Sequence, residues 1–319
     1  MKDITDIIAN TILHIMEKHS TAKFFQVAGM VFDVRSEYKS GANTFHPNLM
    51  LFEIKAPPSG AEPVVIEHHF SIPEKFTELD DKKAASARPM WTIFQTDTGW
   101  IYKKQPALPV SDTQTAYFEF NSDFSCCRVY SDFLNPHTYE AGEFTSLTLF
   151  GCDQALISHL LATRNSILVH ANALVYKDNG FLLAGPSGAG KTTLSTMLEK
   201  HGFQNIADDR IIITAEKNSP PVMHGSWFHG TTAMVSTAQH RLRSFFFLEH
   251  AHENSIIPIE DTRKKIGCLL QSVVRPCIQC HEWNRLLLTL DNLAGSVPCS
   301  YLKFDLSGNI INTIKNIFR

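Results

Sequence analysis

Residues 185–193 bring together glycines, a lysine and two threonines at a spacing suited to binding phosphate groups. They match the pattern Gly-x-x-x-x-Gly-Lys-Thr, in which glycines let successive backbone N–H groups point at phosphate oxygens at the start of a helix. The lysine of this pattern supplies a positive charge to the β- and γ-phosphates, and the hydroxyl after it can bind Mg²⁺. The residues predicted to bind a nucleotide are Gly185, Pro186, Ser187, Gly188, Ala189, Gly190, Lys191, Thr192 and Thr193.

The segments on either side of this loop have the character that such a site needs. Residues 181–184, Phe-Leu-Leu-Ala, form a short apolar run that predicts a buried strand. Lys191 to His201 has helical spacing, with Leu194, Met197 and Leu198 on one face. The sequence therefore predicts strand, loop and helix in the required order. A glycine-rich turn that only caps a helix is the alternative interpretation.

The dipeptide Asn179-Gly180 between two apolar runs indicates a β-hairpin. We therefore expect the strand that enters the loop to pair antiparallel with residues 168–176. In an ordinary βαβ unit that strand would instead follow a helix.

Two neighbouring acids, Asp208 and Asp209, follow the apolar residues 205–207 and come seventeen positions after Lys191 (208 minus 191). That separation is the length of one helix and a returning strand. Carboxylates at such a strand end can hold Mg²⁺ and take a proton from an acceptor hydroxyl. A solvated turn is the alternative for this pair. His170, on the strand predicted to pair with the loop strand, is either a core histidine or part of the same site.

Composition narrows the class of protein. The chain has 319 residues, a net charge of −3, a pI near 6.6 and seven cysteines without regular spacing. This charge gives no basic footprint for nucleic acid, and the cysteine usage fits a reducing cytoplasm. Neither a signal peptide nor a membrane-spanning run is recognisable. We expect a cytoplasmic protein without nucleic-acid or membrane partners; the oligomeric state, homo-oligomer included, stays open.

The chain predicts two domains. Residues 1–150 begin with a helix over Met1–His19 and continue as a β-rich domain, with a loop at residues 80–86 and the adjacent His68 and His69 facing opposite sides of a strand. Residues 151–319 form the nucleotide-binding domain, so the fold class is α/β, of the α+β kind. The β-prone runs of the first domain are Phe24–Val34, Leu49–Ile54, Pro63–His69, Trp91–Gln95, Gly99–Lys103, Ala116–Phe120, Cys127–Tyr130 and Phe144–Phe150.

In the second domain the patterns predict further helices and strands. Residues 223–230 form a loop of glycine, histidine and aromatic residues that either covers a substrate or packs Trp227 and Phe228, and residues 277–281 form a helix-to-strand connection. The helices are expected at 153–164, 259–274 and 309–318, and the strands at 210–214, 244–249 and 297–306.

Residues 150–319 resemble the HPr kinase/phosphorylase fold. More narrowly, they resemble the HPr-kinase-related kinases, some of which are encoded with peptide-modifying and lasso-peptide systems. The resemblance rests on the loop, on the two acids at that spacing, on the hairpin that carries His170, and on the segments 224–225, 245–250 and 297–305. The loop with its later Asp-Asp also resembles ATP-dependent phosphoenolpyruvate carboxykinase. The signature segment for the reverse, phosphorylase reaction is not recognised here.

The resemblance implies an ATP-dependent kinase that transfers the γ-phosphoryl group to a hydroxyl, most plausibly a serine of a peptide or protein. Lys191 and the loop backbone would hold the phosphates of ATP, and Thr192 with Asp209 or Asp208 would hold Mg²⁺. Asp208 would be the general base, with His170 near the transferred group. A small-molecule kinase, for instance of free serine, and a non-catalytic ATP-binding regulatory protein are the alternatives.

Overall fold

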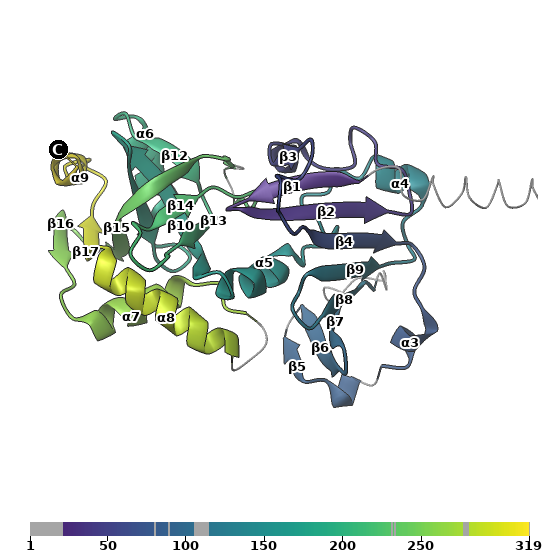
Figure 1. Ribbon diagram of the computed structural model, residues 1–319. Helices are drawn as coiled ribbons and strands as arrows, with labels where there is room; N and C mark the ends of the chain where they lie inside the picture. Colours follow the sequence, from purple (N-terminus) through teal and green to yellow (C-terminus); the bar gives the residue numbers. More distant parts are fainter. Residues whose placement is uncertain are drawn as a thin grey trace, which may run out of the picture. The chain divides into compact units, whose positions relative to one another are not determined.

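The computed structural model describes residues 22–79, 81–88, 90–104, 115–230, 232, 234–276 and 281–318. The chain divides into two compact units, Met1–Asp153 and Gln154–Arg319 (Figure 1). The helix predicted for Met1–His19 lies outside the described residues. Within the described ranges, no helix combines the length and the apolar character needed to cross a membrane. Both units combine a large sheet with helices, as the predicted α+β class requires.

The first unit is built on a nine-stranded sheet with the strand order β3-β1-β2-β4-β9-β8-β7-β6-β5. Strand β4 pairs in parallel with β2 and β9, and the other neighbouring pairs are antiparallel. The strands are β1 (Lys23–Val27), β2 (Met30–Ser36), β3 (Glu53–Ile54), β4 (Val64–His69), β5 (Ser86–Arg88), β6 (Trp91–Thr96), β7 (Gly99–Lys104), β8 (Tyr117–Asn121) and β9 (Cys126–Tyr130). The helical segments are α2 (Pro47–Met50), α3 (Glu74–Thr77), the 3₁₀ turn η1 (Asp81–Lys83) and α4 (Pro136–Glu140).

Side chains alternate across β4, as strand geometry demands. His68 is buried, where its Nδ1 lies 3.1 Å from the Tyr139 hydroxyl and its Nε2 lies 2.8 Å from the Leu147 carbonyl oxygen. His69 lies on the opposite face, with its Nδ1 2.9 Å from Glu37 Oε1. The prediction that the two histidines point apart is confirmed, and no common ligand can join them.

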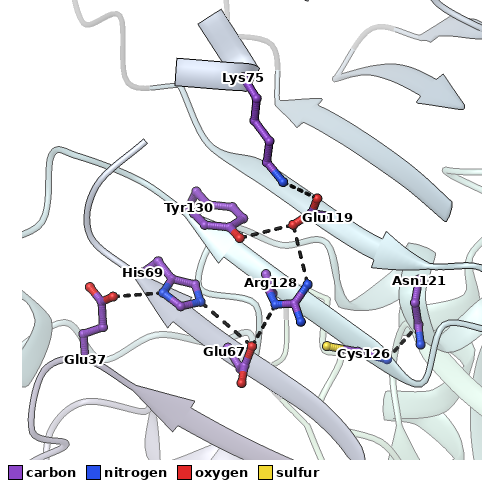
Figure 2. Close-up of polar contacts among 9 residues, drawn as sticks. All are labelled: Glu37, Glu67, His69, Lys75, Glu119, Asn121, Cys126, Arg128 and Tyr130. Carbon is purple, nitrogen blue, oxygen red and sulfur yellow. Dashed lines mark hydrogen bonds and ion pairs between the residues drawn. The ribbon is translucent and has the colours of Figure 1, made fainter. Parts of the chain in front are cut away.

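The face that carries His69 has a row of charged side chains in register across four strands, of which Figure 2 shows Glu67, Arg128 and Glu119. Arg35 on β2 is opposite Glu67 on β4, Glu67 is opposite Arg128 on β9, and Arg128 is opposite Glu119 on β8. The Nε of Arg128 lies 3.0 Å from Glu67 Oε2, and its guanidinium lies 3.7 Å from Glu119 Oε2. Opposite charges on directly paired residues favour this strand order.

Two runs predicted as strands of the first unit need correction: Leu49–Ile54 is a strand only at Glu53–Ile54, and Phe144–Phe150 is not a strand. Residues 47–50 form α2, because Pro47 suits the first turn of a helix and the His46 ring accepts a hydrogen bond from the Asn48 backbone at 3.2 Å. Only Glu53–Ile54 of that run pairs, as β3.

The second wrong run is Phe144–Phe150, where a single bridge between Phe45 and Phe144 replaces the strand. The Asp153 carboxylate accepts hydrogen bonds from the backbone of Leu147 (2.7 Å) and Thr148 (2.8 Å). These donors therefore cannot join a sheet ladder.

The second unit is built on an eight-stranded sheet in which β11 pairs with both β10 and β15. Neighbouring strands thus close a ring through β10, β13, β14, β15 and β11. The long β10 pairs with β13 through residues 166–170 and with β11 through residues 171–176. The strands are β10 (Ser166–Tyr176), β11 (Asn179–Ala184), β12 (Gln204–Ala207), β13 (Arg210–Thr214), β14 (Val222–His224), β15 (Gln239–His250), β16 (Ser255–Pro258) and β17 (Cys299–Phe304).

The predicted hairpin is confirmed, because β10 and β11 pair antiparallel from Ala171–Ala184 to Tyr176–Asn179. The turn itself falls two residues earlier than the Asn-Gly pair. Lys177 (φ 48°) and Asp178 (φ 63°) both take the left-handed conformation of a two-residue turn. Asn179 stabilises it by donating from its side-chain amide to the Lys177 carbonyl at 2.9 Å.

Two hydrophobic cores are formed by the second unit. One joins Leu194 and Leu198 of α6 to Phe246 and to Ile314 of α9. The other contains buried residues of β10 and β13 together with α7 and α8, which lie side by side (Figure 1). The helices are α5 (Asp153–Ala162), α6 (Lys191–Glu199), α7 (Thr262–Ser272), α8 (His281–Ser296) and α9 (Ile310–Ile317).

Helix α8 was missed by the sequence analysis, which gave residues 277–281 as a connection and no helix after it. The signal is present: Leu286, Leu290 and Leu293 are four and three residues apart and all are buried. Residues 277–280 themselves lie outside the described part of the chain.

Candidate functional site

The glycine-rich loop runs from the end of β11 at Ala184 to the start of α6 at Lys191. Gly188 (φ 80°) and Gly190 (φ 88°) adopt left-handed backbone conformations, which a side chain would strain. A Cβ on Gly190 would also lie 2.7 Å from the Phe304 ring, so glycine is required there twice over. Ser187, Thr192 and Thr193 are exposed, and the loop is therefore open to a ligand.

The ammonium group of Lys191 lies within this loop. Its Nζ donates hydrogen bonds to the carbonyl oxygens of Gly185 (2.7 Å) and Pro186 (3.2 Å). The residue is 9 % exposed, and burial lowers its pKa, while the negative charge of Asp209 opposes that shift. The lysine is thus held against the inner side of the loop, ready to exchange carbonyl acceptors for a stronger anionic one.

Asp209, His170 and Arg210 form a cluster where β10 meets β13. Asp209 Oδ1 accepts a hydrogen bond from the Arg210 guanidinium at 2.6 Å and lies 3.3 Å from His170 Nε2. Burial lowers the pKa of His170, and the positive charges of Arg210 and Lys191 lower it further, against the opposing effect of Asp209. His170 is therefore neutral near pH 7, and the charges of Arg210, Lys191 and Asp209 all act on it.

Asp208 is turned to different partners. Its Oδ1 accepts from the Gly230 backbone at 2.9 Å, and its Oδ2 accepts from the Thr232 backbone at 2.8 Å and from the Thr232 hydroxyl. The residue is 6 % exposed. The carboxylate therefore ties the segment that contains Gly230 and Thr232 to the end of β12.

The loop predicted for residues 223–230 is only partly a loop, since Met223 and His224 belong to β14. Trp227 is 2 % exposed and contacts Phe228, so its ring packs into the interior. The Ser226 hydroxyl donates to the Arg210 carbonyl at 2.9 Å. The interpretation that this segment packs its aromatic residues therefore holds for Trp227. Gly230, which lies next to Asp208 and Asp209, is the residue of the predicted loop that lies at the candidate site.

A buried hydrogen bond joins the strand of His170 to the helix that follows the loop. The Asn172 amide donates to the Ser195 hydroxyl at 2.7 Å, and that hydroxyl donates to the Lys191 carbonyl. Both side chains are almost fully buried. The first turn of α6 is thereby fixed to β10.

The structure brings together the predicted residues on three elements: the loop with Lys191, the strand end with Asp208 and Asp209, and His170 on β10. Sequence reasoning missed Arg210, Thr232 and the Asn172–Ser195 pair, and it included Gly230 as the last residue of the loop at 223–230. Arg210 directly follows the two acids and could have been found. Thr232 lies twenty-four residues after Asp208, so only the fold shows that the two meet.

Comparison with known proteins gives a family match and a weak structural likeness. A family described as SynChlorMet cassette protein ScmC matches residues 152–319. No curated protein matches the chain. The solved structure of the HPr(Ser) kinase/phosphatase from Coxiella burnetii is 16 % identical over 48 % of this chain and 88 % of that one, with a TM-score of 0.30. A likeness at this level carries no argument about function.

Proposed function

The chain belongs to the family described as SynChlorMet cassette protein ScmC, and we propose that it is an ATP-dependent kinase that phosphorylates a hydroxyl group, specifically a serine of a peptide or protein. The observation that carries the proposal is the arrangement of three side chains at an exposed glycine-rich loop. The Lys191 ammonium is held inside the loop by two carbonyl oxygens, and Asp209 Oδ1 lies 3.3 Å from His170 Nε2. A loop that ends in a lysine, next to an acid and a histidine, has the parts that phosphoryl transfer uses for positioning and charge neutralisation.

The residues of the glycine-rich loop and the start of α6 fit a nucleoside triphosphate. Backbone N–H groups of residues 185–190 and the Lys191 ammonium would hold its phosphates, and the exposed Thr192 hydroxyl would contribute to a Mg²⁺ site. The left-handed Gly188 and Gly190 provide the concave backbone that such a ligand needs. When bound, ATP with Mg²⁺ supplies the transferable phosphoryl group.

Asp208 and Asp209 have different roles in this proposal. Asp209 is the more open of the two and faces His170, so it suits contact with the metal ion or the transferred group. Asp208, proposed from the sequence resemblance as the general base, also accepts hydrogen bonds from Gly230 and from Thr232. A base that is tied to a loop over the site can be aligned with the acceptor hydroxyl by that loop.

Transfer of label from γ-labelled ATP tests this function. The full chain is incubated with Mg²⁺, ATP and either free serine or serine-containing peptides encoded beside its gene, and phosphoserine is measured in each product. Label on peptide, lost in a Lys191→Ala variant, supports the proposal. Label on free serine alone shows the small-molecule kinase. Mg²⁺-dependent ATP binding without any transfer shows the regulatory protein, and no ATP binding at all overturns the nucleotide site.

A further inference from the structure

A second candidate site lies in the same unit, in an open groove of about 640 Å³ that we call the distal groove. Strand β14 leaves β15 at the hydrogen bond from Leu242 N to Pro221 O (2.8 Å), and β17 joins β15 at the bond from Phe245 N to Pro298 O (2.9 Å). Arg243 lies between these two points and lines the groove. Its walls are residues 215–221, Arg241–Arg243, Asn292, Ser296 and Pro298.

The distal groove lies away from the glycine-rich loop. Along the parallel pair of β11 and β15, Gly180 is opposite Leu242, whereas Ala184, which directly precedes the loop, is opposite Phe247. Leu242 and Phe247 are five positions apart on β15, about 16 Å at about 3.3 Å per residue. The groove therefore shares no residue with the candidate nucleotide site.

Unpaired positive charge is the chemical feature of the groove. The side chains of Arg241 and Arg243 are exposed, and neither has a hydrogen bond or ion pair to another residue of the described chain. Lys217 on the opposite wall is likewise without such a partner, and Glu216 is the one acid among the lining residues. Three cations against one anion stand out in a chain whose net charge is −3.

We propose that the distal groove binds an acidic, extended segment of a peptide or protein. Arg241 and Arg243 lie two positions apart on β15, no more than about 6.6 Å along the strand, and both exposed side chains line the groove. Carboxylates at alternate positions of an extended peptide repeat at that spacing, and a guanidinium can bind a carboxylate through two parallel hydrogen bonds.

The lining and size of the groove favour this occupant over others. The walls are mostly charged and amide or hydroxyl side chains, which do not suit the apolar face of a helix. A volume of about 640 Å³ is far larger than one small inorganic anion needs. The proposal stands apart from the kinase assignment, although a kinase that selects a peptide would gain specificity from contacts outside its catalytic site.

The test uses a fluorescein-labelled octapeptide of alternating glutamate and serine, with an octapeptide of alternating lysine and serine as its counterpart. Fluorescence anisotropy measures the binding of each to the full chain at low salt. We expect binding of the glutamate peptide only, weakened as salt rises. The double substitution Arg241→Glu/Arg243→Glu is expected to weaken that binding at least about tenfold.

The matched control is Arg263→Glu/Lys264→Glu, which makes the same charge change on exposed residues of α7 outside the groove. An equal loss in both double variants would reduce the effect to overall charge and overturn the proposal. So would the absence of glutamate-selective binding by the wild-type chain, a result that does not depend on any variant folding. The neutral single variants Arg241→Gln and Arg243→Gln should each lose part of the affinity. ATP binding, measured separately, is expected to be unchanged in all of them.

Discussion

Asp208 and Asp209 are neighbours in the chain, yet their carboxylates serve different partners. Asp208 accepts hydrogen bonds from Gly230 and Thr232, whereas Asp209 meets His170 and Arg210. Adjacent residues that leave a strand end in different directions can connect two parts of a site. Here they connect the segment that contains Gly230 to the charged residues near Lys191.

Substitution of the two acids is expected to separate these roles. Asp208→Asn should lower phosphoryl transfer about 10²–10⁴-fold if the carboxylate is the base. It should also lower the melting temperature, because an amide nitrogen would face a backbone donor, at a cost of about 1–3 kcal/mol. Asp209→Asn should lower transfer with a smaller change in melting temperature. Thermal melting measures the change in melting temperature, and single-turnover kinetics measures the rate of transfer. An Asp208→Asn variant with wild-type turnover would show that Asp208 is not the base.

Lys191→Ala should weaken ATP binding and abolish transfer, because it removes the charge held inside the loop by the carbonyls of Gly185 and Pro186. Titration calorimetry with ATP and Mg²⁺ measures the affinity. Lys200→Ala, an exposed lysine at the end of the same helix, is the matched control. Equal ATP affinity in the Lys191 variant and the wild type would contradict the loop assignment.

His170→Gln should retain more activity than His170→Ala. The histidine acts as a neutral group near pH 7, since burial, Arg210 and Lys191 lower its pKa, and the amide of glutamine can still reach Asp209. We expect transfer by the glutamine variant to stay within about tenfold of the wild type. A comparison of transfer rates at pH 6 to 8 checks this, and equal losses in both variants would rule out a hydrogen-bonding role for the ring.

Gly225→Ala should destabilise the second unit. A Cβ at this position would lie 1.9 Å from the backbone oxygen of Ser236, and backbone cannot move aside cheaply. Gly267→Ala on α7 meets nothing within 4 Å and should raise stability by about 0.5–1 kcal/mol through helix propensity. Thermal melting of the two variants should therefore shift in opposite directions.

The charged row of the first unit predicts a pH window for its stability. His69, whose Nε2 lies 4.0 Å from Glu67 Oε2, and then Arg128 lower the pKa of Glu67 to about 2. The contribution of Glu67 to stability is therefore present above its usual pKa and is lost as pH falls toward 2. Glu67 and Glu37 raise the pKa of His69, so its contribution is present below its usual pKa and is lost as pH rises through the raised value. The stabilising contributions of Glu67 and His69 are both fully present between about pH 4.5 and pH 6.5.

Glu67→Gln should therefore lower the free energy of unfolding most in that window, by about 1 kcal/mol for partly exposed pairs. The loss should become progressively smaller toward pH 2. Melting curves of the variant and the wild type at pH 3, 5.5 and 8 measure the difference. A cost that does not vary with pH would show that packing, not charge, stabilises this face.

The sequence by itself determined the local features of the candidate site. Loop glycines, the lysine that starts α6, the hairpin before the loop and the strand end at Asp208 are all encoded within about fifty residues, where spacing and turn chemistry act directly. The α+β class also followed from patterning. The exact turn at Lys177 and Asp178 did not, because the asparagine beside it stabilises the turn from outside.

Only the tertiary structure decided the rest. The Asp153 carboxylate takes the backbone donors of residues 147 and 148, and so overrides the β-propensity of that run. The ring formed by β10, β13, β14, β15 and β11 brings Thr232 to Asp208, and it places Arg241 and Arg243 beside the turn at residues 215–221. Contacts between segments far apart in the chain follow from how strands pair and close, and no short-range pattern carries that information.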